Sequence, residues 1–401
     1  MLNRRTFVQT MGAGAVGVLG GLSSDLSAQT PTSAQAPARL AGTAATSAVR
    51  IGGNENPYGP SPKAIEAIAT VSPGANRYPG VLIGGLITAV AAKFSVPEDM
   101  ILLSGGSGDL INAIVSAYSG KGKVMLTGLP SYEQPTRTTQ RIGGRVVEVG
   151  LTGDLKLDLP AMATKVVGTD LVYICNPNNP TSTALPAAEV AAFIESTVAA
   201  SPSTHILVDE AYIDYADLKG VDTVAPLARK HPQVIVIRTM SKAHGMAGMR
   251  VGYAIAQPKT LAEIREYHSG SGLSSMSLAA ATASLKDVAN IAKQQELNRK
   301  VRSYTTDAFT AAGYVVAASD ANFIFVNIKR DSRVFQEACR VKGVQVGRAF
   351  PPMTTWARIS IGTQEEMTRS VPVFMSVLGA PPTQTAMNLD HLDALPSELM
   401  V

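Results

Sequence analysis

Short apolar runs alternate with stretches of helical periodicity between about residues 100 and 256, and this pattern predicts strands separated by helices. The strands predicted here are Met100–Leu103, Val124–Thr127, Arg145–Val149, Leu171–Cys175, His205–Asp209, Val234–Ile237 and Val251–Ala256. This alternation is typical of a mainly parallel sheet covered by helices, so we expect an α/β fold.

Helical periodicity also continues on both sides of this region. Helices are predicted near Pro62–Ala69, Val81–Phe94, Asp109–Tyr118, from Pro130 onward, Leu159–Val166, Ala187–Val198, Thr260–His268, Val288–Ala312, Ser332–Val341 and Glu365–Leu378. In the C-terminal third the predicted strands are Tyr314–Ala317, Asn322–Ile328 and Trp356–Gly362. This third is therefore expected to form a smaller α+β domain, and the Gly/Ser-rich piece Ser269–Ser277 marks the boundary.

The domain organisation follows from these patterns. We expect a signal peptide at 1–28, a linker rich in Ala, Thr, Ser and Pro at 29–48, an N-terminal arm at 49–75, a large domain at 76–270, a small domain at 271–380 and a tail at 381–401.

Composition narrows the function classes. The chain has 401 residues, of which 45% are hydrophobic and 16% charged, which describes a globular protein with a large core. A net charge of +4 without a dense basic run after the N-terminus argues against nucleic acid as a partner. Cys175 and Cys339 have no metal-ligand or CxxC spacing, and we predict two buried free thiols.

The N-terminus resembles a twin-arginine (Tat) export signal. Arg4 and Arg5 precede a weakly apolar segment that ends near Leu22 and is short for a membrane span. Cleavage is expected after Ala28, which leaves a periplasmic or exported protein without a stable membrane anchor. A disordered tail or an uncleaved anchor is the alternative.

The segment from Arg238 to Arg250 carries the most specific chemistry. It follows a buried strand and contains Ser241 and Lys242. A lysine at the end of a buried strand can have a lowered pKa and form a Schiff base, while a serine hydroxyl and the guanidinium of Arg250 suit a phosphate. An aldehyde that carries a phosphate describes pyridoxal 5′-phosphate. A surface loop with two ordinary basic residues is the alternative.

Other polar residues also follow predicted strands. The Gly/Ser loop Ser104–Asp109 leads into a helix N-terminus, which suits an anion, although a tight turn would read the same way. Tyr132 can stack on a flat ring or pack in the core, and Asn179 lies in a rigid loop between two prolines. Asp209 can pair with a protonated ring nitrogen or cap a helix, and Tyr212 lies within reach of it. Ligands of parallel sheets bind at the carboxyl ends of strands, so these residues are expected to meet there.

These residues together resemble the fold-type I enzymes that depend on pyridoxal 5′-phosphate (PLP). Within them, the chain is similar to the histidinol-phosphate aminotransferase-like branch of the class I/II aminotransferases, from about Arg50 to Leu378. The motifs that carry the resemblance are Asn54-Glu-Asn-Pro, Arg77-Tyr-Pro, Asn178-Asn-Pro-Thr, Val208-Asp-Glu-Ala-Tyr, Thr239-Met-Ser-Lys and Arg358-Ile-Ser-Ile-Gly.

The resemblance implies a role for each site residue. Lys242 is the Schiff-base lysine, Asp209 holds the pyridine nitrogen, Asn179 and Tyr212 hold the ring hydroxyl, and Tyr132 stacks on the ring. The residues that the resemblance assigns to the phosphate are Ser107, Gly108, Ser241, Arg250 and, from the second subunit of a homodimer, Tyr78. Those that it assigns to the substrate are Arg358, Asn56 and Asn179.

The chain departs from the family pattern at three places. Ser182 stands where glycine is usual, Gly108-Asp109 replaces a more polar ending of the phosphate loop, and Gly347-Arg348 is shifted by one place from a family arginine.

The resemblance implies an aminotransferase that moves an amino group between an amino acid, or a related amine, and a 2-oxo acid. A decarboxylase, lyase or racemase on the same scaffold and a histidinol-phosphate aminotransferase are alternatives. An exported PLP- or amino-acid-binding protein is the non-enzyme alternative, although binding alone does not require Lys242. An export signal is unexpected for histidine synthesis, so we expect an α-amino acid as the substrate.

Overall fold

The structure is a computed structural model that describes residues 48–270 and 272–380. The expected signal peptide, the C-terminal tail and the expected linker up to residue 47 lie outside the described residues. Within the two described ranges, no helix combines the length and the apolar character needed to cross a membrane.

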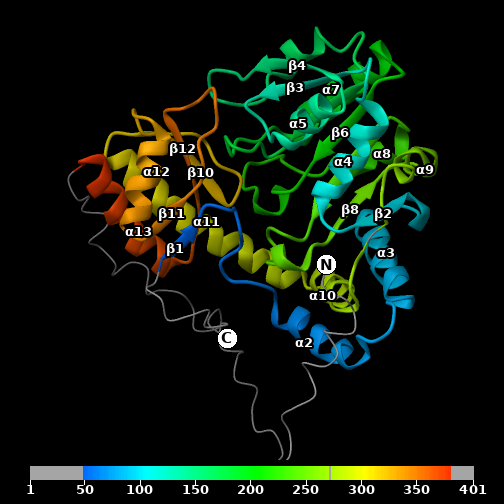
Figure 1. Ribbon diagram of the computed structural model, residues 1–401, viewed down its shortest axis with the longest axis horizontal. Coiled ribbons are helices and arrows are strands. Elements are labelled where there is room, and N and C mark those ends of the chain that lie inside the picture. Colours follow the sequence, from blue (N-terminus) through cyan, green and yellow to red (C-terminus); the bar gives the residue numbers. More distant parts are fainter. Residues whose placement is uncertain (1–47, 271, 381–401) are drawn as a thin grey trace, which may run out of the picture. The chain divides into compact units, whose positions relative to one another are not determined.

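A seven-stranded sheet with the order β2-β8-β7-β6-β5-β3-β4 forms the centre of the first core (Figure 1). Its strands are β2 Ile101–Ser104, β3 Val124–Leu129, β4 Arg145–Gly150, β5 Leu171–Cys175, β6 His205–Asp209, β7 Val234–Thr239 and β8 Gly252–Ile255. Only β8 runs antiparallel to its neighbours, β2 and β7, among the strands of this sheet. The predicted α/β fold with a mainly parallel sheet is confirmed.

Both faces of the sheet are apolar over its central strands, which is why these strands read as continuous apolar runs, whereas the edge strand β4 is partly exposed. In β5, Val172 and Ile174 pack into the cluster on one face, while Leu171 and Tyr173 pack into the cluster on the other. The alternation follows from the two-residue period of a strand. Cys175 and Cys339 are both free and buried, as predicted.

Helices cover this sheet and connect its strands. They are α2 Pro62–Val71, α3 Val81–Phe94, α4 Ser107–Tyr118, α5 Gln134–Arg141, α6 Leu159–Ala163, α7 Ala187–Ala200, α8 Ala225–Lys230, α9 Pro258–Arg265 and α10 Ser275–Lys286. Single turns of 3-10 helix are η1 Ser72–Gly74, η2 Glu98–Met100, η3 Ile213–Tyr215 and η4 Ala247–Met249. The helix predicted from Pro130 begins only at Gln134, because Asn178 hydrogen-bonds to Ser131 and to the carbonyl of Pro130 and keeps them in a loop.

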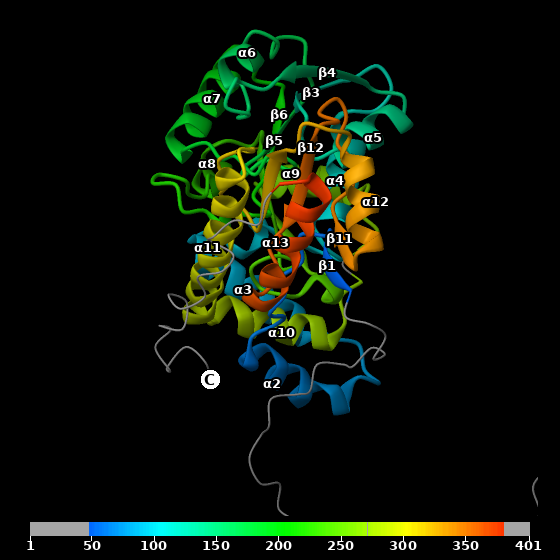
Figure 2. The ribbon, with the colours of Figure 1, turned by 90° about the vertical axis from the view of Figure 1, so that its left-hand side faces the viewer.

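A second core lies around a three-stranded antiparallel sheet of order β12-β10-β9. Its strands are β9 Val315–Val316, β10 Phe323–Asn327 and β12 Trp356–Ser360, and its helices are α11 Val288–Ala311, α12 Ser332–Val341 and α13 Gln364–Leu378. Figure 2 shows α11 extending from α10 along this core. The two-stranded parallel pair of β1 Val49–Ile51 and β11 Val344–Val346 also packs here.

Four elements were absent from the sequence prediction: α8, α10, β1 and β11. Helix α10 begins inside the expected Gly/Ser boundary, where the Ser274 hydroxyl accepts a hydrogen bond from the Ser277 amide (3.1 Å) and caps the helix. Its small residues pack with α2 and α3 in the first core. Buried side chains of α11 join the second core from Val301 onward. The domain limits at 75 and 271 stay predictions.

Candidate active site

A cavity of about 650 Å³ lies where the carboxyl ends of β3, β5, β6 and β7 approach the first turn of α4. This is the edge at which parallel sheets bind ligands. The expected site residues that line it are Ser107, Gly108, Tyr132, Asn179, Asp209, Tyr212, Ser241, Lys242, Arg250 and Arg358. The structure therefore brings together residues that are spread over 250 positions of the sequence. Tyr132, Asn179, Asp209 and Lys242 meet here as their places after strands predicted, whereas Arg358 comes from within β12.

Two expected site residues do not reach this cavity. The Asn56 amide donates to the carbonyl of Ala243 (3.1 Å) and to Gln294 Oε1 (3.1 Å), so it supports the segment after Lys242. Tyr78 is 100% exposed. A substrate role for Asn56 is therefore not supported by its contacts, and Tyr78 is open to a partner molecule.

The ammonium of Lys242 lies against the N-terminal loop. Lys242 Nζ donates to the carbonyls of Asn54 (3.0 Å) and Gly53 (3.4 Å), and it lies 5.4 Å from the centre of the Tyr212 ring. Burial lowers the pKa of Lys242 to about 8, and the Arg358 guanidinium acts in the same direction. More of the amine is therefore neutral near physiological pH, as a nucleophile or proton acceptor requires.

Asp209 is a buried carboxylate at the end of β6, with only 3% of the residue exposed. It accepts hydrogen bonds from the Tyr173 hydroxyl (3.0 Å) and from the amide of Ala211 (3.1 Å). Burial raises the pKa of Asp209 to about 6 in spite of these two donors. A cationic partner in the cavity would stabilise its charged form.

An anion cradle lies at the N-terminus of α4. Gly106 precedes the helix at φ +103°, and a Cβ atom there would lie 2.4 Å from Arg250 Nη2. Glycine is therefore required for this close approach of the guanidinium. Arg250 Nη1 also donates to the hydroxyl of Ser241 (3.4 Å). A guanidinium, a hydroxyl and the free amides of a helix N-terminus make a phosphate site.

Arg358 projects into the cavity from β12. Its Nη1 donates to Asn179 Oδ1 (2.8 Å) and its Nη2 to the carbonyl of Gly52 (2.9 Å). Its buried Nε has no hydrogen-bond partner among the described residues. Burial lowers the pKa of Arg358 to about 10, so the side chain stays charged at neutral pH. A largely buried cation that lines a cavity points to an anionic ligand.

Sequence reasoning missed three contributors to the site. Asn54, quoted only as part of a motif, donates to the Tyr212 hydroxyl (3.1 Å), and its carbonyl receives Lys242. Tyr173, which donates to Asp209, looked like an ordinary core residue of its strand. The signal in the sequence was its spacing of two residues from Cys175, since residues i and i+2 of a strand lie on the same face. Arg348 lines the cavity and pairs with Glu133 (2.7 Å). In the sequence it was noted only as lying one place away from a family arginine.

These residues fit PLP. The cradle at Gly106 suits its phosphate, the buried charge of Asp209 suits a protonated ring nitrogen, and the pKa of Lys242 suits a bond to its aldehyde. Gly108, which departs from the family pattern, leaves the anion site at the N-terminus of α4 intact. Its carbonyl accepts a hydrogen bond from Gln134 (2.7 Å), which fixes the first turn of α4.

Comparison with known proteins agrees with this geometry. A histidinol-phosphate aminotransferase from Moorella thermoacetica is 33% identical over 323 residues, which cover 79% of this chain and 82% of that protein. An aromatic amino acid aminotransferase from Rhodococcus opacus is 36% identical over 320 residues, or 80% of this chain and 87% of that protein. The crystal structure of histidinol-phosphate aminotransferase from Sinorhizobium meliloti in complex with pyridoxal-5′-phosphate has a TM-score of 0.78 at 27% identity, and the match covers 83% of this chain and 91% of that one.

The family assignment extends over most of the chain. Residues 46–373 match the profile of the family described as aminotransferase class I and II. This range contains the whole first core, the second core up to Val371 and every residue that lines the cavity. The chain therefore belongs to the aminotransferase class I and II family, and it is a transaminase that depends on pyridoxal 5′-phosphate.

Proposed function

We propose that the chain transfers the amino group of an α-amino acid to a 2-oxo acid, and that Arg358 binds the substrate carboxylate. The observation that carries this proposal is the largely buried guanidinium of Arg358, which lines the same cavity as Lys242. A guanidinium edge matches a carboxylate through two parallel hydrogen bonds. Aromatic amino acids are the first candidates, because a relative that is 36% identical to this chain is an aromatic amino acid aminotransferase.

In this mechanism, Lys242 moves the proton. Its amine, with a pKa lowered by burial, accepts the proton of the substrate α-carbon and returns it as an acid. Asp209 would hold the ring nitrogen of the bound cofactor through its negative charge. Asn179, which donates to the Tyr212 hydroxyl (3.4 Å), would orient the ring hydroxyl together with Tyr212. The bound cofactor supplies a conjugated ring that stabilises negative charge on the substrate carbon.

Histidinol phosphate is the second candidate substrate. A neighbouring cavity of about 690 Å³ shares Arg348 and Arg358 with the first and adds Arg50 and Arg340, and arginines suit a phosphate. Arg50, Arg340 and Arg348 already pair with glutamates, however, so their charge is partly compensated. The α-amino acid therefore remains our first proposal.

The first test is a screen of amino acids and histidinol phosphate against the purified, PLP-loaded protein. We expect turnover of an α-amino acid with 2-oxoglutarate, and a 2-oxo acid as the product. Conversion of the amino acid in the absence of any 2-oxo acid acceptor would indicate decarboxylation, elimination or racemisation instead. Efficient turnover of histidinol phosphate with no amino acid accepted would overturn the proposed substrate.

Replacing Arg358 with lysine is expected to lower kcat/KM for the best amino acid by about 1.5–3 kcal/mol, the range of a hydrogen bond to a charged group. Lysine keeps a positive charge but lacks the planar fork. Steady-state kinetics measure the effect. The matched control is Arg333→Lys, because Arg333 is an exposed arginine that pairs with Asp331 on α12. Equal kinetics for the Arg358→Lys variant and the parent would contradict the role of Arg358.

We also propose a homodimer in which Tyr78 reaches the phosphate of the partner's cofactor. The support is the family resemblance together with the full exposure of Tyr78 and the 89% exposure of Val81 beside it. Sedimentation should therefore give a dimer, and Tyr78→Phe should weaken cofactor binding about 3- to 10-fold through the loss of one hydrogen bond. Tyr267→Phe, at another exposed tyrosine, is the control. Full activity at dilutions where the chain is monomeric would refute a composite site.

Finally, we propose export by the twin-arginine route, on the basis of Arg4 and Arg5 ahead of a weakly apolar segment. Changing both arginines to lysine should retain the folded, cofactor-bound protein in the cytoplasm. Fractionation of cells that express the parent or the variant measures this directly. Unchanged periplasmic recovery of the variant would count against the proposal.

A further inference from the structure

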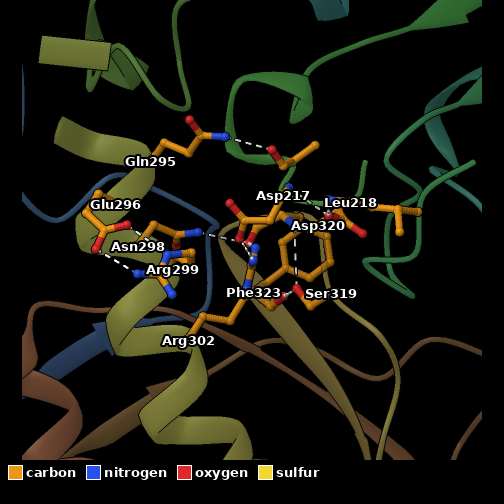
Figure 3. Close-up of polar contacts among 12 residues, drawn as sticks. Asp217, Leu218, Gln295, Glu296, Asn298, Arg299, Arg302, Ser319, Asp320 and Phe323 are labelled. Atoms are coloured by element: carbon orange, nitrogen blue, oxygen red, sulfur yellow. Dashed lines mark hydrogen bonds and ion pairs between the residues drawn. The ribbon is translucent and has the colours of Figure 1, made fainter. Parts of the chain in front are cut away.

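Three segments of the chain meet in a polar cluster outside the cavity. They are α11, residues 216–218 after η3, and residues 319–322 before β10 (Figure 3). We call the side chains of Asn298, Arg302, Asp217 and Asp320 the clasp. Figure 3 shows Arg302 and Asn298 directed from α11 toward the other two segments.

The clasp joins the three segments pairwise, through side chains of α11 and through the Asp320 carboxylate. Arg302 Nη2 pairs with the Asp217 carboxylate, and its Nη1 donates to the carbonyl of Ala321 (2.8 Å), which also accepts from Asn298 (3.2 Å). In return, Asp320 Oδ1 accepts from the backbone amides of residues 217 and 218 (2.8 Å each). Each segment is thus tied to the other two by charged or backbone hydrogen bonds.

Stability alone does not account for this ion pair. The side chain of Arg302 is only 8% exposed. Burial lowers the pKa of Arg302 and raises the pKa of Asp217, in each case against the effect of the partner charge. An ion pair with one partner buried in this way is often replaceable by apolar residues, so its presence is weak evidence for a role in stability alone. Its geometry, in contrast, is specific, because the guanidinium fork holds a carboxylate and a carbonyl at once.

One side of the clasp leads to Arg358. The strand β10 begins at Phe323, three residues after Asp320 of the clasp, and pairs with β12, where Phe325 lies opposite Arg358. The amide of Ile361 donates to the carbonyl of Asn322 (2.9 Å) and fixes the register of the two strands. The ring of Phe323 lies 5.6 Å from the Arg358 guanidinium and meets the Tyr212 ring edge-on at 5.0 Å.

The other side of the clasp leads to Asn179, which accepts the hydrogen bond from Arg358. The amide of Asp320 donates to the carbonyl of Ser182 (2.8 Å), three residues after Asn179 in the same loop. Ser182 has φ +64°, a conformation that favours glycine, and its hydroxyl bonds to the Thr181 carbonyl. Both parts of the Arg358–Asn179 pair are thus anchored on residues 320–322.

We propose that Arg302 is a positioning residue for substrate binding, and that it holds residues 320–322 so that Arg358 and Asn179 present one preformed carboxylate site. This inference rests on the proposed role of Arg358. Arg302 itself touches neither the cavity nor the reacting atoms, and it acts through Ala321 and β10.

The test compares Arg302→Lys with Arg299→Lys in the PLP-loaded protein. Lysine at 302 keeps a charge for Asp217 but has no fork to hold the Ala321 carbonyl as well. Arg299 lies on the same helix, pairs with Glu296 (2.7 Å) and has a side chain that is 46% exposed, so its substitution is the matched control. The unreactive carboxylate 3-phenylpropanoate serves as the probe, with its Kd measured by calorimetry beside KM and kcat for the best amino acid.

For Arg302→Lys we expect the probe Kd and KM to rise together, on the order of 3- to 30-fold, which is the range of coupling through a side-chain network. We expect kcat to stay within about threefold, and Arg299→Lys to change nothing beyond about twofold. The proposal is overturned if Arg302→Lys has the Kd and KM of the control, even when its melting temperature falls, because that result assigns a purely structural role. A loss confined to kcat overturns it as well.

Two further variants keep the outcome decisive. If Arg302→Lys gives no soluble protein, Asp217→Asn takes its place under the same criterion, since it removes the partner charge at constant size. Arg358→Lys is titrated with the same probe. Unchanged probe binding in Arg358→Lys would mean that the proposed carboxylate site is wrong, whereas weakened binding there and parental binding in Arg302→Lys would reject only the role of the clasp.

Discussion

Replacing Lys242 with arginine is expected to lower kcat on the order of 10³-fold or more. Arginine keeps a positive charge at the position but stays protonated, so it neither bonds to an aldehyde nor accepts a proton from carbon. In the parent, burial and the Arg358 guanidinium lower the pKa of Lys242 to about 8, which makes the neutral amine accessible. Single-turnover kinetics with saturating PLP and amino acid measure the loss.

Chemical mapping provides the control for this prediction. Borohydride reduction of the PLP-loaded parent, followed by peptide mass mapping, should place the adduct on Lys242, and the arginine variant should yield none. Lys63→Arg is a matched substitution at a surface lysine that pairs with Asp287 (3.0 Å) away from the cavity. An adduct on another lysine, or none in PLP-supplied parent, would show that the assignment is wrong.

Replacing Asp209 with asparagine is expected to lower kcat about 10²- to 10³-fold, because a neutral amide does not stabilise positive charge on the cofactor ring nitrogen. The same change should stabilise the cofactor-free protein. Burial raises the pKa of Asp209 from 3.8 to about 6, so the folded state holds the proton more tightly than the unfolded state does. Ionisation of Asp209 therefore costs the folded state about 3 kcal/mol at neutral pH.

The sign of this effect gives a pH dependence. The free energy of unfolding of the cofactor-free parent should fall between about pH 4 and pH 6 through Asp209, and the asparagine variant should lack that fall. The asparagine variant should therefore exceed the parent in free energy of unfolding by the full amount above about pH 6, and by nothing below about pH 4. Denaturant titrations across this range measure it, with Asp222→Asn as the exposed control. A variant less stable than the parent at neutral pH would contradict the argument.

Much of this protein could be predicted from the sequence because the signals are local. The sequence pattern predicted every strand of the seven-stranded sheet. Central strands such as β5 are apolar throughout because they are buried on both faces, whereas the edge strand β4 carries the exposed Arg145 and Glu148. The site was also predictable in outline. Polar residues such as Asp209 and Lys242 directly follow apolar strands, and the carboxyl ends of parallel strands share one edge.

Other features could not be read from any local stretch. The pair of β1 and β11 joins three-residue segments that are almost 300 residues apart, too short to show a period. Helix α10 begins at Ser275, inside the Gly/Ser-rich piece that predicted a boundary, because the Ser274 hydroxyl caps it and its leucine and alanine side chains pack against α2 and α3. Both outcomes depend on a partner segment that the local sequence does not specify.

The sequence by itself thus determined the strands of the large sheet, most of its covering helices and the polar residues that directly follow strands, because periodicity is a property of neighbouring residues. Only the tertiary structure decided which asparagine serves the site: Asn54 reaches Tyr212, whereas Asn56 turns to Gln294. It also decided that Arg302, one of many arginines in the sequence, is buried against Asp217. Such choices rest on which distant segments satisfy each other's buried polar groups, and that pairing exists only in the folded chain.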